Sequence, residues 1–286
     1  PADGNGKKDQ YGLDCYNPQN YDERFRGPVN LRQALSQSLN IPSVKVLYLA
    51  GINDTIKTAQ NMGITTLDNP NRYGLSLVLG GAEVKLIDMA SAYGVFANDG
   101  TRNPWATIQK VESADGTTLE EKEDNPQRVL DEQVARLINN VLSDNSARAP
   151  VFGYSSSLYI PGYAVAAKTG TTQENRDAWV IGYSPSIAVG VWAGNNKNES
   201  MTRAGAGISA SGPMWHEFMV GALAKLPNDQ FNPPNPVTSD KPMLNGQVER
   251  HSILYYVNTS DPLGLAPANP SKDSQFNNWE WSINAY

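Results

Sequence analysis

The sequence predicts an α/β domain in which helices flank an antiparallel sheet, and three observations support this class. Residues 83–97 carry apolar side chains at the i, i+3, i+4 spacing of a helix that buries one face. The runs 178–183 and 187–192 are rich in β-branched and aromatic residues across a short Ser/Pro turn, which predicts a hairpin. A closing helix follows over 214–223, with Pro213 in its first turn. We therefore expect an α+β sandwich, with helical layers around the strands.

The first 63 residues predict a loop and then three helices. Asn30 caps a helix that ends near residues 38–40, because Ile41 precedes Pro42 and is disfavoured in the α region. A second helix is expected from Pro42 to Ala50, and a third is capped by Asn53 and ended by Gly63.

The middle of the chain predicts a strand over 105–113 that turns at 114–116, and then a helix capped by Asp131. The helix over 83–97 is expected to bury one face made by Leu86, Met89, Ala90, Tyr93, Phe96 and Ala97. The helix after Asp131 is expected to bury Val134, Leu137, Ile138 and Val141. The aromatic side chains expected in the core are Trp105, Trp179, Trp192 and Trp215.

Composition divides the chain near residue 227 and excludes several classes of protein. Residues 1–226 form one predicted domain, and 227–286 are interpreted as a Pro-rich linker and a tail that packs on it. The formal charge of −6 argues against a nucleic-acid partner. One cysteine and two histidines argue against a disulfide or a His-rich metal site, and we expect no cofactor. The polar first ten residues resemble a loop entered in mid-domain, so we expect a truncated chain.

A Lys-Thr-Gly sequence lies on the predicted strand in front of the hairpin. Lys168 supplies a fixed cation for a substrate carboxylate or for a proton network, and the hydroxyls of Thr169 and Thr171 can donate to the same anion. Gly170 leaves room for a substrate backbone against the strand. The alternative is a solvated lysine on an edge strand.

A second polar group, Ser38-Leu39-Asn40, lies at the end of the first predicted helix, about 130 residues before Lys168. A hydroxyl and an amide at this place can shuttle a proton and hold a substrate amide. The alternative is a helix C-terminus whose polar residues cap carbonyl groups.

Several linked motifs resemble class A, or bifunctional, penicillin-binding proteins. The similar segments are 32–44 around Ser38 and Asn40, 79–84, 92–100, and 168–172 followed by 177–179 and 182–183. The resemblance covers roughly residues 16–223. It implies the fold of a penicillin-binding transpeptidase and a location on the outer face of the bacterial cytoplasmic membrane, held by an anchor that is not in this chain.

The resemblance also implies a D,D-transpeptidase, in which a serine attacks the D-Ala-D-Ala carbonyl of a peptidoglycan stem peptide. It gives Ser38 and Asn40 the proton-shuttle and amide-holding roles, with Lys168 as the electrostatic partner of Ser38. Thr169 and Thr171 would bind the substrate carboxylate, and Gly170 would make room for the ligand. The backbone N–H of Thr171 would form half of the oxyanion hole. Stem peptides and β-lactams are the implied ligands.

The chain departs from the family at its nucleophile, because no serine in the 286 residues has a lysine three positions later. Thr107 and Lys110 have that spacing but lie in a predicted strand. We therefore expect the nucleophile on an upstream segment that acts as a partner of this chain.

Three other functions remain open. Residues 162–169 nearly match the phosphate-binding loop of NTPases, but Ala167 replaces the second glycine and no helix follows. The absent Ser-x-x-Lys favours a non-catalytic binding or scaffolding domain of the same fold. A serine β-lactamase or a sensor domain would use the same chemistry.

Overall fold

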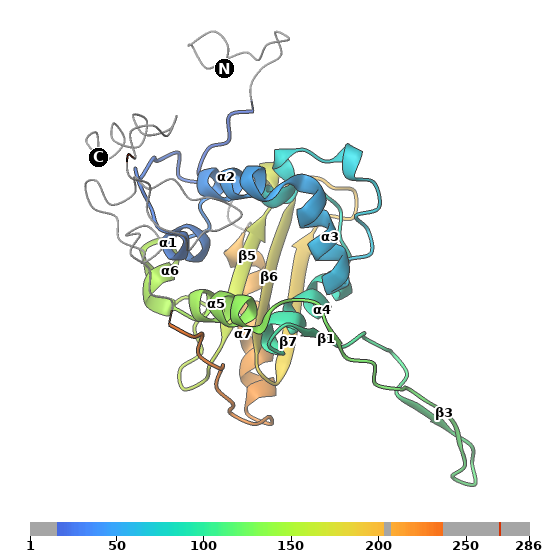
Figure 1. Cartoon of the computed structure of the whole chain (residues 1–286). Helices are drawn as coiled ribbons and strands as arrows, with labels where there is room; N and C mark the ends of the chain where they lie inside the picture. The colour runs from blue at the N-terminus through green and yellow to red at the C-terminus, as the bar shows by residue number, and fades with distance from the viewer. Residues whose placement is uncertain (1–15, 203–206, 237–268, 270–286) are drawn as a thin grey trace.

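The computed structural model describes residues 16–202, 207–236 and 269. Its centre is a three-stranded antiparallel sheet in the order β5-β6-β7, formed by Ala166–Thr171, Asp177–Ser184 and Ile187–Gly194 (Figure 1). The hairpin expected over 178–192 is confirmed, with Ser184 opposite Ile187. In the described part of the chain, β5 pairs with β6 alone, so its other edge is open.

Helices cover the two faces of this sheet. Successive residues of a strand point to opposite faces, and the pair Ile181 and Gly182 shows which helix covers which face. A Cβ added at Gly182 would lie 2.1 Å from the Trp215 ring of α7 (Ile208–Leu223). The Ile181 side chain instead approaches Gly190, which also lies against Leu86 of α4 (Leu86–Ala97). The α/β sandwich is therefore confirmed, with α7 on one face and α4 on the other.

The three predicted N-terminal helices are present as α1 (Leu31–Ser36), α2 (Asn40–Ala50) and α3 (Ile52–Met62). Asn30 and Gln33 cap α1 reciprocally, and Gly63 ends α3 in the left-handed conformation that glycine favours. The boundary expected at Pro42 is wrong, since α2 begins two residues earlier. Proline is tolerated there because the first turn of a helix needs no N–H from it.

The other helical elements differ in part from the expected ones. They are η1 (Pro70–Arg72), η2 (Leu75–Leu79), α4, α5 (Glu132–Leu142), α6 (Asn145–Phe152), η3 (Gln173–Asn175) and α7. The predicted Asp131 cap is confirmed, because its side chain accepts from the Gln133 N–H. The sequence did not predict α6. The start expected for α7 is wrong, since this helix begins at Ile208 and carries Pro213 in its interior.

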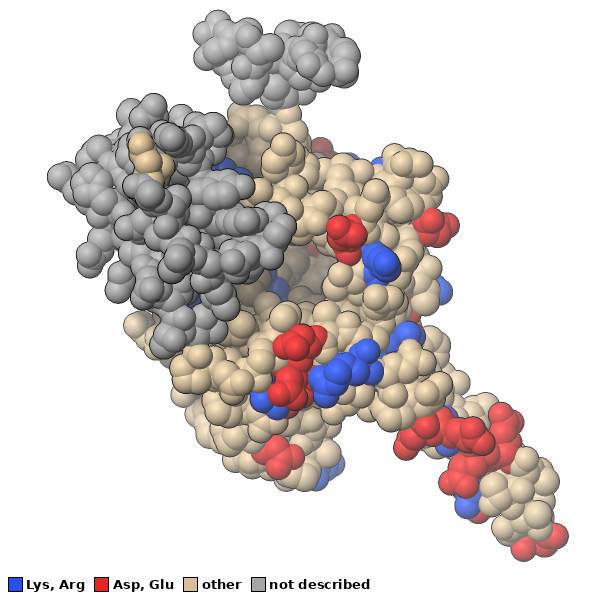
Figure 2. Space-filling view, viewed as in Figure 1, with Lys and Arg blue, Asp and Glu red and all other residues tan. Residues whose placement is uncertain are grey.

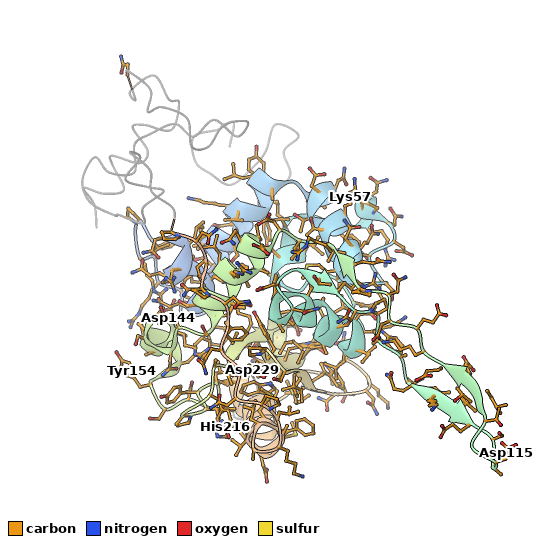
Figure 3. The ribbon with its side chains drawn as sticks, turned by 60° about the horizontal axis from the view of Figure 1, so that its bottom comes forward. Lys57, Asp115, Asp144, Tyr154, His216 and Asp229 are labelled. Atoms are coloured by element: carbon orange, nitrogen blue, oxygen red, sulfur yellow. The ribbon has the colours of Figure 1, made fainter. Side chains whose placement is uncertain are left out.

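Residues 101–128 form an arm that projects from the body (Figure 1). Its two short ladders pair β1 (Thr101–Arg102) with β4 (Gln127–Arg128), and β2 (Lys110–Glu112) with β3 (Thr118–Glu121). Acidic side chains gather on the arm in Figure 2, and Asp115 lies at its tip in Figure 3. Trp105, at the start of the arm, is 50% exposed. The prediction that Trp105 belongs to the core is therefore wrong.

The core confirms Trp215 and most of the expected α4 face, since Met89, Tyr93, Phe96 and Ala97 pack against buried clusters. It corrects Trp192, which is 37% exposed, and much of the face expected for α5. On α4 the buried side chains are Asp88, Ala92 and Val95, and on α5 they are Ala135, Asn139 and Leu142. Leu86, Val134 and Leu137, which we expected inside, are exposed. The physical reason is that each helix buries a polar side chain.

The two buried polar side chains are fully hydrogen-bonded. Asp88 accepts from the N–H and the hydroxyl of Thr65, and Asn139 joins the Tyr183 hydroxyl to the Phe96 carbonyl. A prediction from the spacing of apolar residues places Asp and Asn side chains on the exposed face of a helix. The predicted buried face is therefore shifted around the helix axis.

Residues 227–235 run across the body as an extended segment. Asn228 donates to the Gly162 carbonyl, Asn232 donates to Asp99, and the Asn235 N–H donates to the Gln133 side chain. The Phe231 ring packs edge-on against Tyr183. The isolated strand and the tryptophans expected near the C-terminus lie outside the described residues. Among the helices of residues 16–202 and 207–236, none combines the length and the apolar composition needed to cross a membrane.

Candidate active site

Ser38 lies in the short connection between α1 and α2, and its backbone conformation is unusual. The Leu39 N–H donates to the Ala34 carbonyl and the Ser38 N–H donates to the Leu35 carbonyl, which together form a Schellman motif. The position that Ser38 occupies in this motif is left-handed, and its φ is 58°. Glycine is the usual residue at such a position, so a serine there is a strained choice that points to a role for its hydroxyl.

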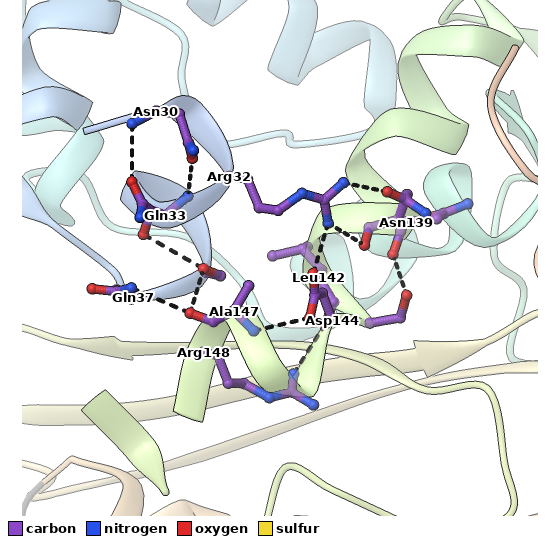
Figure 4. Close-up of polar contacts among 12 residues, drawn as sticks. Asn30, Arg32, Gln33, Gln37, Asn139, Leu142, Asp144, Ala147 and Arg148 are labelled. Carbon is purple, nitrogen blue, oxygen red and sulfur yellow. Dashed lines mark hydrogen bonds and ion pairs between the residues drawn. The ribbon is translucent and has the colours of Figure 1, made fainter. Parts of the chain in front are cut away.

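Helix α1 is fixed to α5 and α6, and this determines where Ser38 lies (Figure 4). Arg32 donates to the Asn140 carbonyl at 3.1 Å and to the Asp144 carboxylate at 3.0 Å. Ser36 and Gln37, the residues just before Ser38, both donate to the Ala147 carbonyl of α6. The Ser38 turn is therefore held on a rigid support rather than on a free loop.

Lys168 brings the two predicted motifs together. Its Nζ donates to Ser38 Oγ at 2.6 Å and to the Thr169 carbonyl at 2.9 Å. The expectation that Ser38 and Lys168 lie within hydrogen-bond reach is confirmed across 130 residues of sequence. Lys168 shares a strand face with Ala166, which packs with Leu142 of α5, so its side chain extends toward the helical layer that carries Ser38.

The ammonium group of Lys168 is enclosed by protein atoms although the residue as a whole is only half-buried. Because burial disfavours the charged form, it lowers the pKa of Lys168 from 10.5 to about 8. A lysine with such a pKa can hold or release a proton near neutral pH.

We expect the Lys168 side chain to titrate near pH 8 in the folded chain. Between this value and 10.5, the unfolded chain keeps a proton that the folded chain has lost, so the free energy of unfolding should rise with pH across this window. An NMR titration of the lysine Cε–Hε signals measures the pKa, and Lys168→Ala identifies the signal. A Lys168 midpoint above pH 10 would contradict the buried ammonium.

Thr169, Gly170 and Thr171 follow Lys168 along the open edge of the sheet. The Thr172 N–H donates to the Asp177 carbonyl, so hydrogen-bonded rungs fall at every second residue from Thr172. Thr169 and Thr171 lie between these rungs, and their N–H and C=O groups therefore point away from β6. Gly170 faces Trp179 on β6, and an added methyl would meet Trp179 Cβ at 3.4 Å.

The hydroxyls of Thr169 and Thr171 lie on the sheet face that α7 covers, the face opposite to Lys168. A Cβ added at Gly207, the residue that precedes α7, would lie 3.2 Å from Thr171 Oγ1. The N-terminus of a helix carries partial positive charge and favours an anion nearby. The sequence analysis missed this contribution, because it placed the start of α7 six residues too late.

Asn40 does not contact Ser38 or Lys168 through its amide. Its Nδ2 donates to the Gln19 carbonyl at 2.7 Å, and the buried Asn20 side chain accepts from the Ile41 N–H. The structure thus brings Ser38 and Lys168 together and directs Asn40 toward the segment that precedes α1. In residues 16–202 and 207–236, no three side chains of His, Cys, Asp and Glu gather as a metal centre requires.

A second polar group, to which the sequence analysis gave no role, ends the Lys-Thr-Gly strand. Thr172 Oγ1 donates to one oxygen of the Asp177 carboxylate at 2.8 Å, and Trp192 Nε1 donates to the other at 2.8 Å. The Asp177 backbone N–H in turn donates a hydrogen bond to Thr172 Oγ1 at 2.9 Å. The local signal in the sequence was the polar residue at each end of the six-residue segment 172–177.

Comparison with known proteins identifies one family. The family model described as the penicillin binding protein transpeptidase domain matches residues 2–220. Penicillin-binding protein 1A of Aquifex aeolicus is 35% identical over 218 residues, which cover 76% of this chain and 29% of that protein. Penicillin-binding protein 2D of Bacillus subtilis is 32% identical over 284 residues, which cover 91% of this chain and 39% of that protein. The chain therefore spans less than half the length of these relatives.

A solved structure has a similar fold. The penicillin-binding protein PonA1 from Mycobacterium tuberculosis in complex with penicillin V is 32% identical with a TM-score of 0.66. The alignment covers 77% of this chain and 63% of that one.

Proposed function

The chain belongs to the penicillin-binding protein transpeptidase family, and from this premise we propose that it forms part of a serine D,D-transpeptidase that cross-links peptidoglycan. One observation carries the proposal most directly. Lys168 Nζ lies 2.6 Å from Ser38 Oγ, and Lys168 lies on β5, whose outer edge pairs with no other strand of the described residues and can accept an extended peptide.

In the proposed reaction a serine oxygen attacks the D-Ala-D-Ala carbonyl, and the terminal D-Ala leaves as an amine after it takes up a proton. An amine of a neighbouring strand then attacks the acyl-enzyme, loses its own proton and releases the serine. Ser38 and Lys168 form the proton relay, because the hydroxyl both accepts and donates and the lysine pKa lies near 8. We place the nucleophile outside residues 1–286, since none of their serines has the Ser-x-x-Lys spacing.

Substrate binding is assigned to the Lys-Thr-Gly strand. The hydroxyls of Thr169 and Thr171 would donate to the substrate carboxylate, and the nearby N-terminus of α7 would favour its negative charge. The Thr171 N–H points to the open edge of the sheet, because hydrogen-bonded pairs alternate along the strand, and it would stabilise the oxyanion. Gly170 has no side chain and would leave room for the ligand against the strand. Asn40 would hold the substrate amide after it leaves the Gln19 carbonyl.

The proposed ligands are stem peptides and β-lactams, and the proposed location is the outer face of the cytoplasmic membrane. Penicillin V bound to the mycobacterial relative supports the β-lactam part of this proposal. The upstream nucleophile segment is the remaining proposed partner. The non-catalytic alternative rests on the missing Ser-x-x-Lys alone.

We expect the 286-residue chain to form no stable adduct with a fluorescent penicillin, because it lacks a serine activated by a neighbouring lysine. The full-length product of its gene should form a stoichiometric adduct. Intact-mass spectrometry measures both. An adduct on the isolated chain would place the nucleophile among its own serines, and no adduct on the full-length protein would favour the non-catalytic alternative.

A further inference from the structure

The strand that carries Thr171 ends in an irregular rung. In a regular antiparallel pair, Thr172 and Asp177 would exchange two backbone hydrogen bonds. Only one is present, from the Thr172 N–H to the Asp177 carbonyl at 3.2 Å. The Asp177 N–H donates instead to the Thr172 hydroxyl, and the Thr172 carbonyl accepts from the Asn175 N–H at 3.2 Å. The Thr172 side chain thus takes the place of its own carbonyl in the ladder.

The turn beyond this rung is strained. Glu174 and Asn175 have φ values of 58° and 54°, a left-handed conformation that is unfavourable for glutamate and that asparagine adopts more readily. Two consecutive residues of this kind persist only where their surroundings hold them. The Asp177 carboxylate provides such a hold, because it accepts from Thr172, the residue just after β5, and from Trp192 on β7, and so ties the end of β5 to the other outer strand across β6.

The position of this rung is what relates it to catalysis. The N–H of Thr171 belongs to the peptide that joins Gly170 to Thr171, and hydrogen-bonded rungs lie on both sides of it. One is the Gly170–Trp179 rung inside the ladder, and the other is the Thr172–Asp177 rung at its end. If the end rung opened, no hydrogen bond beyond Thr171 would hold the end of β5, and the Thr171 N–H would lose a fixed direction.

We infer that Asp177 is a positioning residue which, through the Thr172 hydroxyl, holds the Thr171 N–H in place for the oxyanion. The inference rests on the proposed transpeptidase function and gives that site a supporting group. The contact between an N–H and the oxyanion exists only in the transition state. Loosening the rung should therefore slow the covalent step by a larger factor than it weakens non-covalent binding, to which Thr171 contributes only its hydroxyl.

The test compares Thr172→Val, which keeps the shape but removes the hydroxyl, with Thr172→Ser, which keeps the hydroxyl. In the full-length protein, Thr172→Val should slow acylation at saturating fluorescent penicillin by about tenfold or more, since losing a whole oxyanion donor costs about 10²–10³. The non-covalent Kd should rise by a smaller factor than the rate falls, and Thr172→Ser should acylate within about twofold of wild type. Unchanged acylation in Thr172→Val, or a Kd that rises by as much as the rate falls, would overturn the inference.

Lys168→Ala, measured in parallel, separates this inference from the proposed function. Slow acylation in Lys168→Ala with normal acylation in Thr172→Val would refute the positioning role alone. A second readout needs no catalysis, because Asp177→Asn in the 286-residue chain should speed hydrogen exchange of the Thr172 amide by about tenfold or more without changing global stability. If the Thr172 amide stays protected, Asp177 does not hold the rung.

Discussion

Lys168→Ala should slow β-lactam acylation of the full-length protein by about a hundredfold or more, the scale of losing one electrostatic group in a transition state. The substitution removes the ammonium that lies 2.6 Å from Ser38 Oγ, so the proposed relay loses its cation and Ser38 loses its donor. Stability should change far less, because the removed charge was desolvated in the fold. Stopped-flow acylation with a fluorescent penicillin and a urea melt measure the two effects.

The matched control is Lys57→Ala, which removes an exposed ammonium from α3 (Figure 3) and should acylate at the wild-type rate. If Lys168→Ala also acylates within about threefold of wild type, Lys168 is not part of the reaction. A large loss of stability in Lys168→Ala would instead show that this lysine holds the fold together.

Trp215→Ala should lower the free energy of unfolding by about 3–5 kcal/mol, the usual range for a buried tryptophan. The Trp215 side chain is fully buried on α7, and its Nε1 donates to the Val189 carbonyl of β7. Its ring fills the space over Gly182, so truncation would open a cavity between α7 and the sheet. Equilibrium urea unfolding measures the change.

Trp105→Ala provides the matched control, since the same residue type at the base of the arm is 50% exposed. It should cost about 1–2 kcal/mol, clearly less than Trp215→Ala, because it opens no cavity and removes a hydrogen bond to Asp88. Equal losses in the two variants would mean that the arm packs on the body more tightly than its exposure indicates.

Local signals predicted much of the fold. The Ser184 turn between two β-rich runs predicted the hairpin, and Asn30, Gly63 and Asp131 predicted helix ends, because caps and turns depend on neighbouring residues. Most of the α4 face was predicted, but the buried Asp88 was not, and the α5 face was wrong at Val134 and Leu137. The reason is that Asp88 and Asn139 are buried with partners that lie 23 or more residues away. The spacing of apolar residues along a helix carries no information about such distant partners.

The candidate site, like the fold, could be predicted from the sequence only in part. Neither three-residue motif was specific by itself, and only the order of several motifs suggested that Ser38 and Lys168 belong together. The distance between them depends on how α1 docks on α5 and α6, through contacts such as the bond of Arg32 to Asp144. Asp177 could not be assigned a role from the sequence, because its partners are Thr172, the residue just after β5, and Trp192 of β7, which only the folded sheet brings together.

Because the backbone at Ser38 is left-handed, selection for stability and selection for function should favour different residues at this position. Glycine would relax a φ of 58°, so a screen for heat resistance should favour glycine at this position. Under the proposed role, a screen for growth on an intact cell wall should reject glycine, because it has no hydroxyl for Lys168 to contact. A laboratory lineage evolved for robustness alone would therefore lose the relay first at residue 38.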